Sequence, residues 1–239
     1  IPYHDWVWIQ TAATDSLLGN ENHIVLALEN LISNAQFFTG RVKYRKVEKQ
    51  SRIAIQLDEH NGYIRYQIYN RGPHIDAEAA HRLFQLGYST RRVKEHHGKG
   101  LGLYFVNEII KGYDGKMAFS NVYNTADVLS LRIETDTGEV ITDVIELLIE
   151  DGTPCCRKTG SDTATGQLDW SFSGNLESIE ITHQSDQLTH RRLCESLSHG
   201  SLLDPSQEAQ PRWQLEMDSK RKKLTTLVFK PLNVAGVLF

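Results

Sequence analysis

The amino-acid sequence predicts an α+β fold, with helices and strands in its first half and a strand-rich extension in its second half. Apolar residues recur every three or four positions over residues 24–38, which is the spacing of an amphipathic helix. Residues 53–57 and 64–68 each alternate apolar with polar side chains, and Asn61-Gly62 between them favours a tight hairpin. After about residue 135 the periodic pattern is less regular, and apolar segments are separated by loop-like stretches.

The other elements of the first half follow from the same two periodicities. The helix over residues 24–38 can begin at Asn20 or Asn22, either of which can cap its first turn, and Gly40 follows its end. The segments after the hairpin are expected to form a short helix over 77–86, a polar and basic mobile loop over 88–97, a helix over 101–110, and strands over 116–121 and 128–133.

The second half is predicted to consist of strands joined by loops. Residues 140–149 are apolar and fit either a strand or a helix, residues 176–181 fit a strand, and residues 151–166 and 202–211 are loop-like. Residues 213–217 and 224–229 are expected to pair as a hairpin around the basic residues 220–223, which are most simply a solvated turn. This hairpin is a candidate to complete the sheet of the first half.

The charge of the chain is uneven along its length. Its 239 residues carry 26 Lys and Arg against 30 Asp and Glu, and the net charge of −4 argues against bulk nucleic-acid binding. Residues 1–135 hold 16 basic and 14 acidic side chains, whereas residues 136–239 hold 10 and 16, which favours two units. We therefore expect a lead-in segment over 1–19, an α/β domain over 20–135 and an acidic β-rich extension of unknown role over 136–239.

Features that would place the chain in a membrane or an oxidising compartment are absent from the sequence. No apolar run approaches the roughly 18 residues that span a bilayer, and no signal peptide opens the chain. Because the sequence begins at Ile1, we expect it to be a piece of a longer protein, whose other part can hold membrane segments. Cys155, Cys156 and Cys194 form no C-x-x-C pair, which favours a reducing compartment and a structural role, or none, for the thiols.

The first candidate functional feature is a pair of asparagines one helical turn apart. With about 100° per residue, Asn30 and Asn34 fall together, roughly 100° to one side of the apolar stripe of their helix. The amide oxygen of Asn34 suits Mg²⁺, which takes few ligands from a protein while phosphates and waters supply the rest. Glu29 projects about 120° from the pair, so we do not choose it as a catalytic base. The alternative is an Asn pair that makes only local hydrogen bonds.

The second feature is a glycine-rich segment that leads into a helix. Gly98, Gly100 and Gly102 permit backbone conformations that let a phosphate approach the main-chain amides. The helix that follows offers free N–H groups and the positive end of its dipole. The spacing matches neither a P-loop nor a dinucleotide-binding fingerprint. A flexible glycine-rich turn is the alternative.

The third feature is Asn70 at the end of a predicted strand. A short polar side chain in this place can hydrogen-bond an adenine amino group, and Gly72 lets the base approach the backbone. The alternative is a simple Asn-x-Gly-Pro turn. Taken together, the three features predict a pocket for a nucleoside triphosphate and its magnesium.

Four segments in this order resemble the ATP-binding domain shared by sensor histidine kinases, gyrase-type topoisomerases, the ninety-kilodalton heat-shock chaperone and the mismatch protein MutL. The similarity is greatest to the boxes of sensor histidine kinases: the N-box in residues 26–40 (LALENLISNAQFFTG), the first glycine box in 68–75 (IYNRGPHI), the F-box in 82–90 (RLFQLGYST) and the second glycine box in 98–110 (GKGLGLYFVNEII). The turn at residues 112–116 is also similar, and the match covers about residues 20–133.

This resemblance implies a two-layer α/β sandwich of the Bergerat type that binds ATP and magnesium under a mobile lid, residues 86–97. It implies that Asn34 binds magnesium and that Asn30 orients the attacking group or water, while Asn70 and Gly72 hold adenine. The implied phosphate contacts are Gly98, Lys99, Gly100, Leu101, Gly102 and Leu103. The charge of the phosphates would be steadied by Arg91 and Arg92, with Lys94, His97 and Lys99.

The resemblance also implies partners that lie outside this sequence. The γ-phosphate would pass to a His on a helical hairpin, and then to the Asp of a response regulator. Only His4-Asp5 offers a His-acidic dipeptide near the start, and the residues before Asn30 are too few for two long helices at 1.5 Å per residue. We therefore expect the acceptor domain elsewhere in a homodimeric, inner-membrane-anchored protein, with this domain in the cytoplasm and no nucleic-acid partner.

Two positions depart from the kinase pattern. Asn70 stands where these kinases usually have Asp, and Phe37 stands where the N-box usually has a basic residue, a charge for which Arg41 is one candidate substitute. These departures motivate an alternative, a degenerate nucleotide-binding regulatory domain without phosphotransfer. A chaperone-type or repair-type ATPase of the same superfamily is a further alternative, against which the short lid and the kinase-like second glycine box argue.

Overall fold

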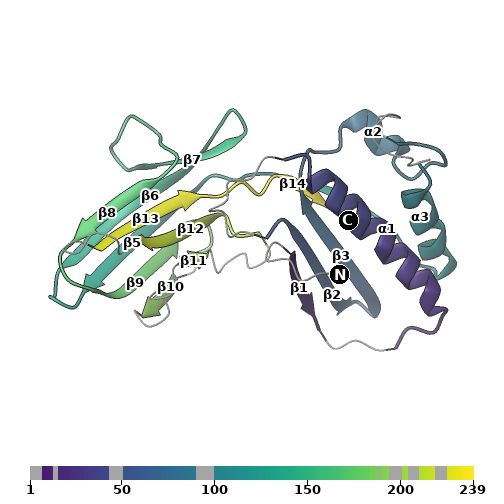
Figure 1. Cartoon of the computed structure of the whole chain (residues 1–239), viewed down its shortest axis with the longest axis horizontal. Helices are drawn as coiled ribbons and strands as arrows, with labels where there is room; N and C mark the ends of the chain where they lie inside the picture. The colour runs from purple at the N-terminus through teal and green to yellow at the C-terminus, as the bar shows by residue number, and fades with distance from the viewer. Residues whose placement is uncertain are drawn as a thin grey trace. The chain divides into compact units, whose positions relative to one another are not determined.

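The computed structural model describes residues 7–12, 16–42, 51–89, 100–187, 189–193, 201–203, 210–218 and 225–239. Its chain divides into two compact units (Figure 1). The first unit comprises Ile1–Tyr123 and Ala235–Phe239, and the second comprises Asn124–Val234. The first unit is therefore discontinuous in sequence, because the chain leaves it after Tyr123 and returns at Ala235.

The first unit is built on one five-stranded sheet with the strand order β1-β2-β3-β14-β4. Its strands are β1 (Val7–Thr11), β2 (Ile53–His60), β3 (Tyr63–Arg71), β4 (Ser120–Val122) and β14 (Gly236–Leu238). Strand β1 is parallel to β2, and the other neighbours are antiparallel. Asn61 and Gly62, between β2 and β3, both have positive φ, as a type I′ hairpin turn requires, so the predicted hairpin is confirmed.

Three helices belong to this unit, α1 (Glu21–Thr39), α2 (Ala77–Arg82) and α3 (Gly102–Gly112). Helix α1 begins as predicted at Asn20, whose side-chain oxygen accepts a hydrogen bond from the Asn22 amide. Its apolar stripe packs on the sheet, where Ala35 is buried with Ile53 and Ile68. Helix α3 packs beside α1, as Figure 1 shows. The first unit thus has helices packed on a sheet, as the α+β prediction requires.

The second unit consists of two antiparallel sheets that share one core. One sheet has the order β10-β9-β5-β6-β7 and the other β11-β12-β13-β8. The first contains β5 (Asp127–Thr135), β6 (Val140–Glu150), β7 (Thr153–Lys158), β9 (Leu176–His183) and β10 (Thr189–Leu193). The second contains β8 (Leu168–Phe172), β11 (Ser201–Leu203), β12 (Trp213–Asp218) and β13 (Thr225–Pro231).

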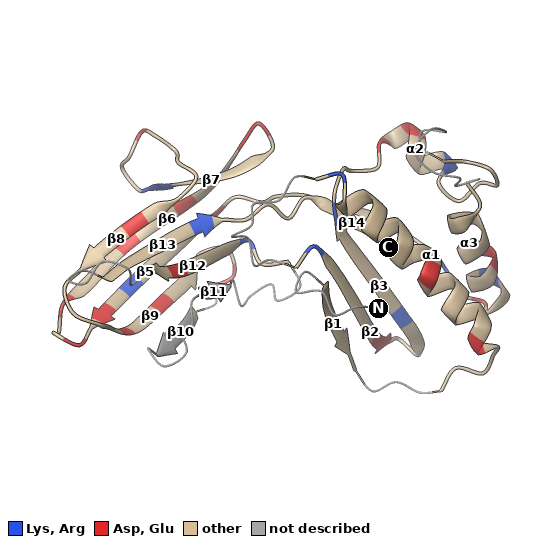
Figure 2. Ribbon diagram, in the orientation of Figure 1, with Lys and Arg blue, Asp and Glu red and all other residues tan. Residues whose placement is uncertain are grey.

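Alternating side chains build this second core. Along β5 every second residue is buried, including Leu129, Leu131 and Ile133, and these face Trp213 and Phe229 of the other sheet within one cluster. Acidic residues are spread over the strands of the unit (Figure 2), and several are neutralised across strands. Examples are Glu146 with Arg157 at 2.6 Å, Glu216 with Lys230 at 2.6 Å, and Asp143 with Lys158 at 2.8 Å.

The structure corrects the predicted domain boundary. Residues 128–133 do form a strand, but that strand is β5 of the second unit, so the first unit ends at Tyr123 rather than near 135. The hairpin of β12 and β13 pairs as predicted but lies in the second unit, and the first sheet is completed instead by β14. Alternation identifies a strand but not the sheet to which it belongs, which is why the boundary was misplaced.

Several local predictions are also corrected. Residues 151–166 were expected to be a loop, but they contain β7, which Asp151 and Gly152 join to β6 through a turn with positive φ at both positions. Residues 140–149, for which the sequence left strand and helix open, form the strand β6. The predicted strand at 116–121 is the shorter β4, the helix at 77–86 ends at Arg82, and β11 lies at the start of the predicted loop 202–211.

The cysteines that the structure describes lie in β7. Cys156 is fully buried, and burial raises the pKa of its thiol to about 12. Cys155 is half-buried, and both free thiols are in a strand that pairs with β6, which fits the structural role predicted for them. Cys194 and His4 lie outside the described residues. None of the described helices is both long enough and apolar enough to cross a bilayer.

Candidate nucleotide-binding site

The first part of the candidate site is the contact between α1 and the start of α3. The side-chain amide of Asn30 donates to the Leu26 carbonyl at 2.8 Å, which holds the side chain against its own helix. A β-carbon placed on Gly102 would lie 2.7 Å from Asn30 Oδ1, closer than such atoms approach in real structures. The N-box and the second glycine box therefore meet here, and a side chain at position 102 would displace the Asn30 amide. Asn34 follows Asn30 by one helical turn and is also half-buried.

The second part is the start of α3 itself. Leu101 occupies the N-cap position and makes no side-chain capping bond, because leucine has no acceptor there. The first N–H groups of α3 are therefore not capped by Leu101, and they lie at the positive end of the helix dipole. Such a helix start favours an anion. The predicted contacts Leu101, Gly102 and Leu103 belong to this turn, and all three are half-buried.

The third part is the contact between Gly87 and Gly100. The Gly87 amide donates to the Gly100 carbonyl at 3.2 Å, so the end of the F-box lies beside the second glycine box. Gly100 has φ of +68°, and a β-carbon there would lie 2.6 Å from the Tyr88 carbonyl oxygen. Both constraints require glycine at position 100. Most of the predicted lid, residues 86–97, lies outside the described residues.

The fourth part is the end of β3 beneath the C-terminal end of α1. Asn70 is only 3% exposed and lies on the same face of β3 as Ile68, which packs against α1. Its amide nitrogen is 3.5 Å from the Arg71 carbonyl oxygen. A β-carbon on Gly72 would lie 3.1 Å from Asn70 Nδ2 and 3.2 Å from the Phe38 carbonyl oxygen, so a side chain at position 72 would crowd both atoms.

Thr39 and Ala235, which sequence analysis did not select, support this junction. The buried hydroxyl of Thr39 donates to the Arg71 carbonyl at 3.1 Å and ties the last turn of α1 to the end of β3. The Gly72 amide donates to the Ala235 carbonyl at 3.2 Å, which connects the first glycine box to the returning chain. No sequence motif marks either contact, because each depends on a backbone group of a distant residue.

Helix α1 connects these parts. Residues 30, 34 and 38 lie on one face of α1, and eight residues at 1.5 Å each separate the Asn30 and Phe38 ends by about 12 Å. The structure thus brings Asn30 to Gly102 at one end and places Asn70 with Gly72 at the other.

Phe37 stands where the kinase pattern expects a basic residue. The guanidinium of Arg41 lies 4.7 Å from the centre of the Phe37 ring and so brings a positive charge to this position.

The remaining predicted site residues lie outside the part of the chain that the structure describes. These are Arg91, Arg92, Lys94, His97, Gly98 and Lys99. Their assignment to the phosphates stays a prediction.

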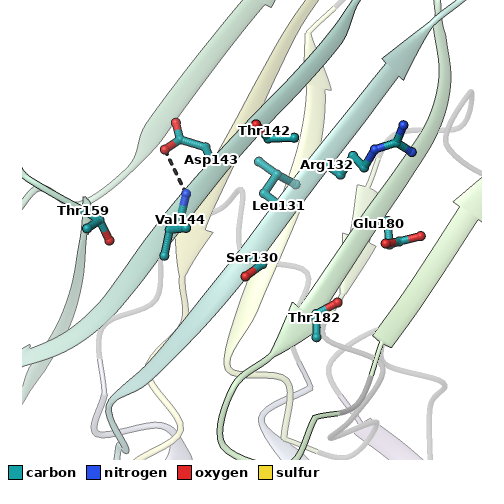
Figure 3. Close-up of a pocket in the computed structure, with 9 residues that line it drawn as sticks. All are labelled: Ser130, Leu131, Arg132, Thr142, Asp143, Val144, Thr159, Glu180 and Thr182. Carbon is teal, nitrogen blue, oxygen red and sulfur yellow. Dashed lines mark hydrogen bonds between the residues drawn. The ribbon is translucent and has the colours of Figure 1, made fainter.

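A different concave region lies on the outer face of the second unit (Figure 3). It has a volume of about 540 Å³ and is lined by residues of β5, β6 and β9 with Thr159. Ser130, Arg132 and Thr182 are among its polar side chains. Arg132 already pairs with Glu134 beside it and lies opposite Glu180 in the sheet, so its charge is balanced within the face. This region has the features of the solvated face of a twisted sheet.

Comparison with known proteins adds to this geometry. Residues 19–150 match the model of a family described as histidine kinase-, DNA gyrase B- and HSP90-like ATPases. The sensor protein ChvG of Agrobacterium fabrum is 31% identical over 114 residues, which cover 47% of this chain and 18% of that protein. The heme sensor protein HssS of Staphylococcus aureus is 35% identical over 118 residues, or 48% of this chain and 24% of that protein. The matched segments thus make up at most about a quarter of these relatives.

Proposed function

Because the chain belongs to the family of histidine kinase-, DNA gyrase B- and HSP90-like ATPases, we propose that its first unit binds ATP with magnesium as the catalytic domain of a two-component sensor histidine kinase. The observation that carries the proposal is the approach of Asn30 to Gly102. It joins the helix with the paired asparagines to the glycine-rich helix start in one place. The similarity to the sensor proteins ChvG and HssS supports the kinase branch of the family.

Two features of the described residues support a nucleotide site in the proposed Bergerat-type fold. Backbone or side-chain atoms come close to the α-carbons of Gly72, Gly100 and Gly102, and the first turn of α3 is not capped by Leu101. We assign the phosphates to this turn and the adenine to Asn70 and Gly72. An amide oxygen on Asn70 can accept a hydrogen bond from the adenine amino group, although without the charge of an aspartate.

The metal and phosphate roles follow the same arrangement. We propose that the Asn34 oxygen is the protein ligand of magnesium and that Asn30 orients the attacking group. A magnesium ion on the phosphates supplies positive charge that offsets the charge developing during transfer. Arg91 and Arg92 are proposed to add to that charge from the lid.

We propose that the whole protein passes the γ-phosphoryl group to a His on a separate acceptor domain and then to a response regulator. The proposal includes a homodimeric, membrane-anchored protein with this domain in the cytoplasm. The relatives that match are named as sensor proteins, which supports a role in signalling.

Titration with a fluorescent ATP analogue, with and without magnesium, tests the proposed site. We expect the chain to bind with a dissociation constant in the micromolar range, and Asn34→Ala to weaken binding in magnesium by about tenfold, or about 1.4 kcal/mol. A suitable control is Asn175→Ala, which changes an exposed asparagine of the second unit. If the unaltered chain does not bind the analogue in magnesium, the proposed function is wrong.

A second candidate is a regulatory domain that binds nucleotide without transferring phosphate. Asn70 and Phe37, which depart from the kinase pattern, favour it. The two candidates differ when the acceptor domain is added together with ATP labelled at the γ-phosphate. Labelled phosphohistidine supports the kinase, whereas nucleotide binding without any phosphohistidine supports the regulatory domain.

A further inference from the structure

The sheet of the first unit is completed by a strand that comes from beyond the second unit. Strand β14 lies between β3 and β4, with Val237 opposite Asn70 on one side and Asn121 on the other. At one end of the pairing the Gly72 amide donates to the Ala235 carbonyl at 3.2 Å. At the other end Ile68 and Phe239 exchange backbone hydrogen bonds of 2.9 and 3.0 Å. The whole end of β3, including Asn70, is therefore paired with residues 235–239.

Gly236 makes this pairing possible. A β-carbon on Gly236 would lie far inside van der Waals contact with the Asn70 carbonyl oxygen and 2.8 Å from the Tyr69 ring. Any other residue at position 236 must therefore move β14 away from β3 or rotate the end of β3. Because Asn70 lies at that end, its side chain would move with it. The Asn70 side chain lies beneath Phe38 and beside Gly72, so it has little room to move without losing these contacts.

The second unit is inserted between two neighbouring strands of this sheet. Val122 of β4 lies opposite Gly236 of β14 in the first unit. Within the second unit, the Asn124 side chain accepts from the Val234 amide at 2.8 Å and donates to Asn233 Oδ1 at 3.1 Å. The segment that leaves the first unit after Tyr123 and the segment that returns to it at Ala235 are therefore adjacent in both units. Tolerated domain insertions commonly have such adjacent ends. Without the returning chain, β3 would become an edge strand with unpaired backbone groups at Asn70.

We infer that β14, through Gly236, is a positioning element for Asn70, so that recognition of the nucleotide base depends on residues 235–239. This inference rests on the proposed function and adds to it an element that lies outside the four boxes of this sequence. It separates base recognition from phosphate binding, because Gly102 and the first turn of α3 make no pairing with β14.

The test compares nucleotides on the full chain. Dissociation constants for ATP, GTP and inorganic triphosphate are measured by competition with the fluorescent analogue. The unaltered chain is expected to prefer ATP to GTP. In Gly236→Val we expect ATP affinity to fall about tenfold, with the affinities for GTP and triphosphate nearly unchanged. Gly166→Ala is the control, because a β-carbon there meets open space and belongs to the second unit.

The outcomes distinguish this inference from the proposed function. If the unaltered chain does not bind ATP, the proposed function is wrong and the inference about β14 loses its premise. If it binds ATP and a folded Gly236→Val variant keeps the full preference for ATP over GTP, the inference is wrong. Equal losses for ATP, GTP and triphosphate also contradict it, since they indicate a general structural defect.

A measurement on the unaltered chain covers the case in which Gly236 variants do not fold. Amide hydrogen exchange of residues 236–239 is followed with and without ATP and magnesium. If β14 positions the base-binding residue, bound ATP must slow exchange in β14 as well as in β3. Protection of α3 without any protection of β14 would overturn the inference.

Discussion

Asn30 of α1 and Gly102 of α3 approach so closely that a β-carbon on Gly102 would lie 2.7 Å from Asn30 Oδ1. The Asn30 side chain is held by its bond to the Leu26 carbonyl, so it cannot withdraw without losing that bond. In Gly102→Val, either the Asn30 side chain must give up that bond or α3 must shift away from α1, and each change alters the contact between the two helices. We expect affinity for the magnesium-bound ATP analogue to fall about tenfold or more, measured by fluorescence titration.

The control for this prediction is Gly112→Ala at the other end of α3, where a β-carbon meets open space. Alanine favours a helix over glycine by up to about 1 kcal/mol, so this variant is expected to unfold at an equal or higher temperature and to bind the analogue normally. Unchanged affinity in Gly102→Val would show that the contact with Asn30 plays no part in the site.

Local periodicity was sufficient to predict the helices and most strands of the first unit. The stripe that ends in Ala35 and Phe38 predicted α1, and Asn61-Gly62 predicted the hairpin of β2 and β3. The completion of the sheet could not be predicted in the same way. Strand β14 has three residues, too few for a periodic signal, and its partners β3 and β4 are separated from it by the second unit.

The short motifs predicted that the paired asparagines and the glycine-rich segment share one place. The structure brings Asn30 against Gly102, and the roles assigned to these residues stay predictions. Thr39 and Gly236 were missed for a physical reason. Their roles consist of contacts with the backbone of residues 70 and 71, and such contacts leave no trace in side-chain chemistry along the sequence. The lid residues Arg91 and Arg92 stay predictions.

We expect Asp127 to make the second unit less stable at low pH. Its buried carboxylate accepts from Ser185 at 3.0 Å, lies 3.0 Å from His183 Nδ1 and is 3.2 Å from Arg212 Nη1. Burial by itself would raise the pKa of Asp127, but the hydrogen bonds from His183, the Val128 amide and Ser185, with the charge of Arg212, hold it below its ordinary value.

The sign of the dependence follows from that direction. A carboxyl group whose pKa is lowered by folding stabilises the folded state above its unfolded pKa of about 3.9 and loses that contribution as the pH falls through its folded pKa. We therefore expect Asp127 to contribute no change in the urea midpoint of unfolding between about pH 7 and 5, and to lower that midpoint as the pH falls below about 4.

The variant Asp127→Asn separates this group from the other carboxylates. Removal of one partner of a buried charged cluster costs about 3–5 kcal/mol, so the variant should unfold at much lower urea at neutral pH. Its midpoint should also fall less steeply below pH 4 than that of the unaltered chain. Asp162→Asn, at an exposed position, is the control. An acid dependence as steep in Asp127→Asn as in the unaltered chain would contradict the assignment.

The bond from Thr39 to the Arg71 carbonyl is expected to affect both stability and binding. Thr39 is 4% exposed and its hydroxyl lies 3.1 Å from that oxygen, so Thr39→Val keeps the shape of the side chain but removes the donor. The Asn70 amide nitrogen also lies 3.5 Å from this carbonyl oxygen, so loss of the Thr39 bond should cost about 0.5–1.5 kcal/mol and lower the urea midpoint of the first unit. Because the bond ties α1 to the end of β3, affinity for the ATP analogue should fall as well.

Thr39→Ser, which retains the hydroxyl, should recover most of the affinity even though the lost methyl group lowers stability. If Thr39→Val and Thr39→Ser bind the analogue equally well, the hydroxyl does not hold Asn70 and Gly72 in place beneath α1.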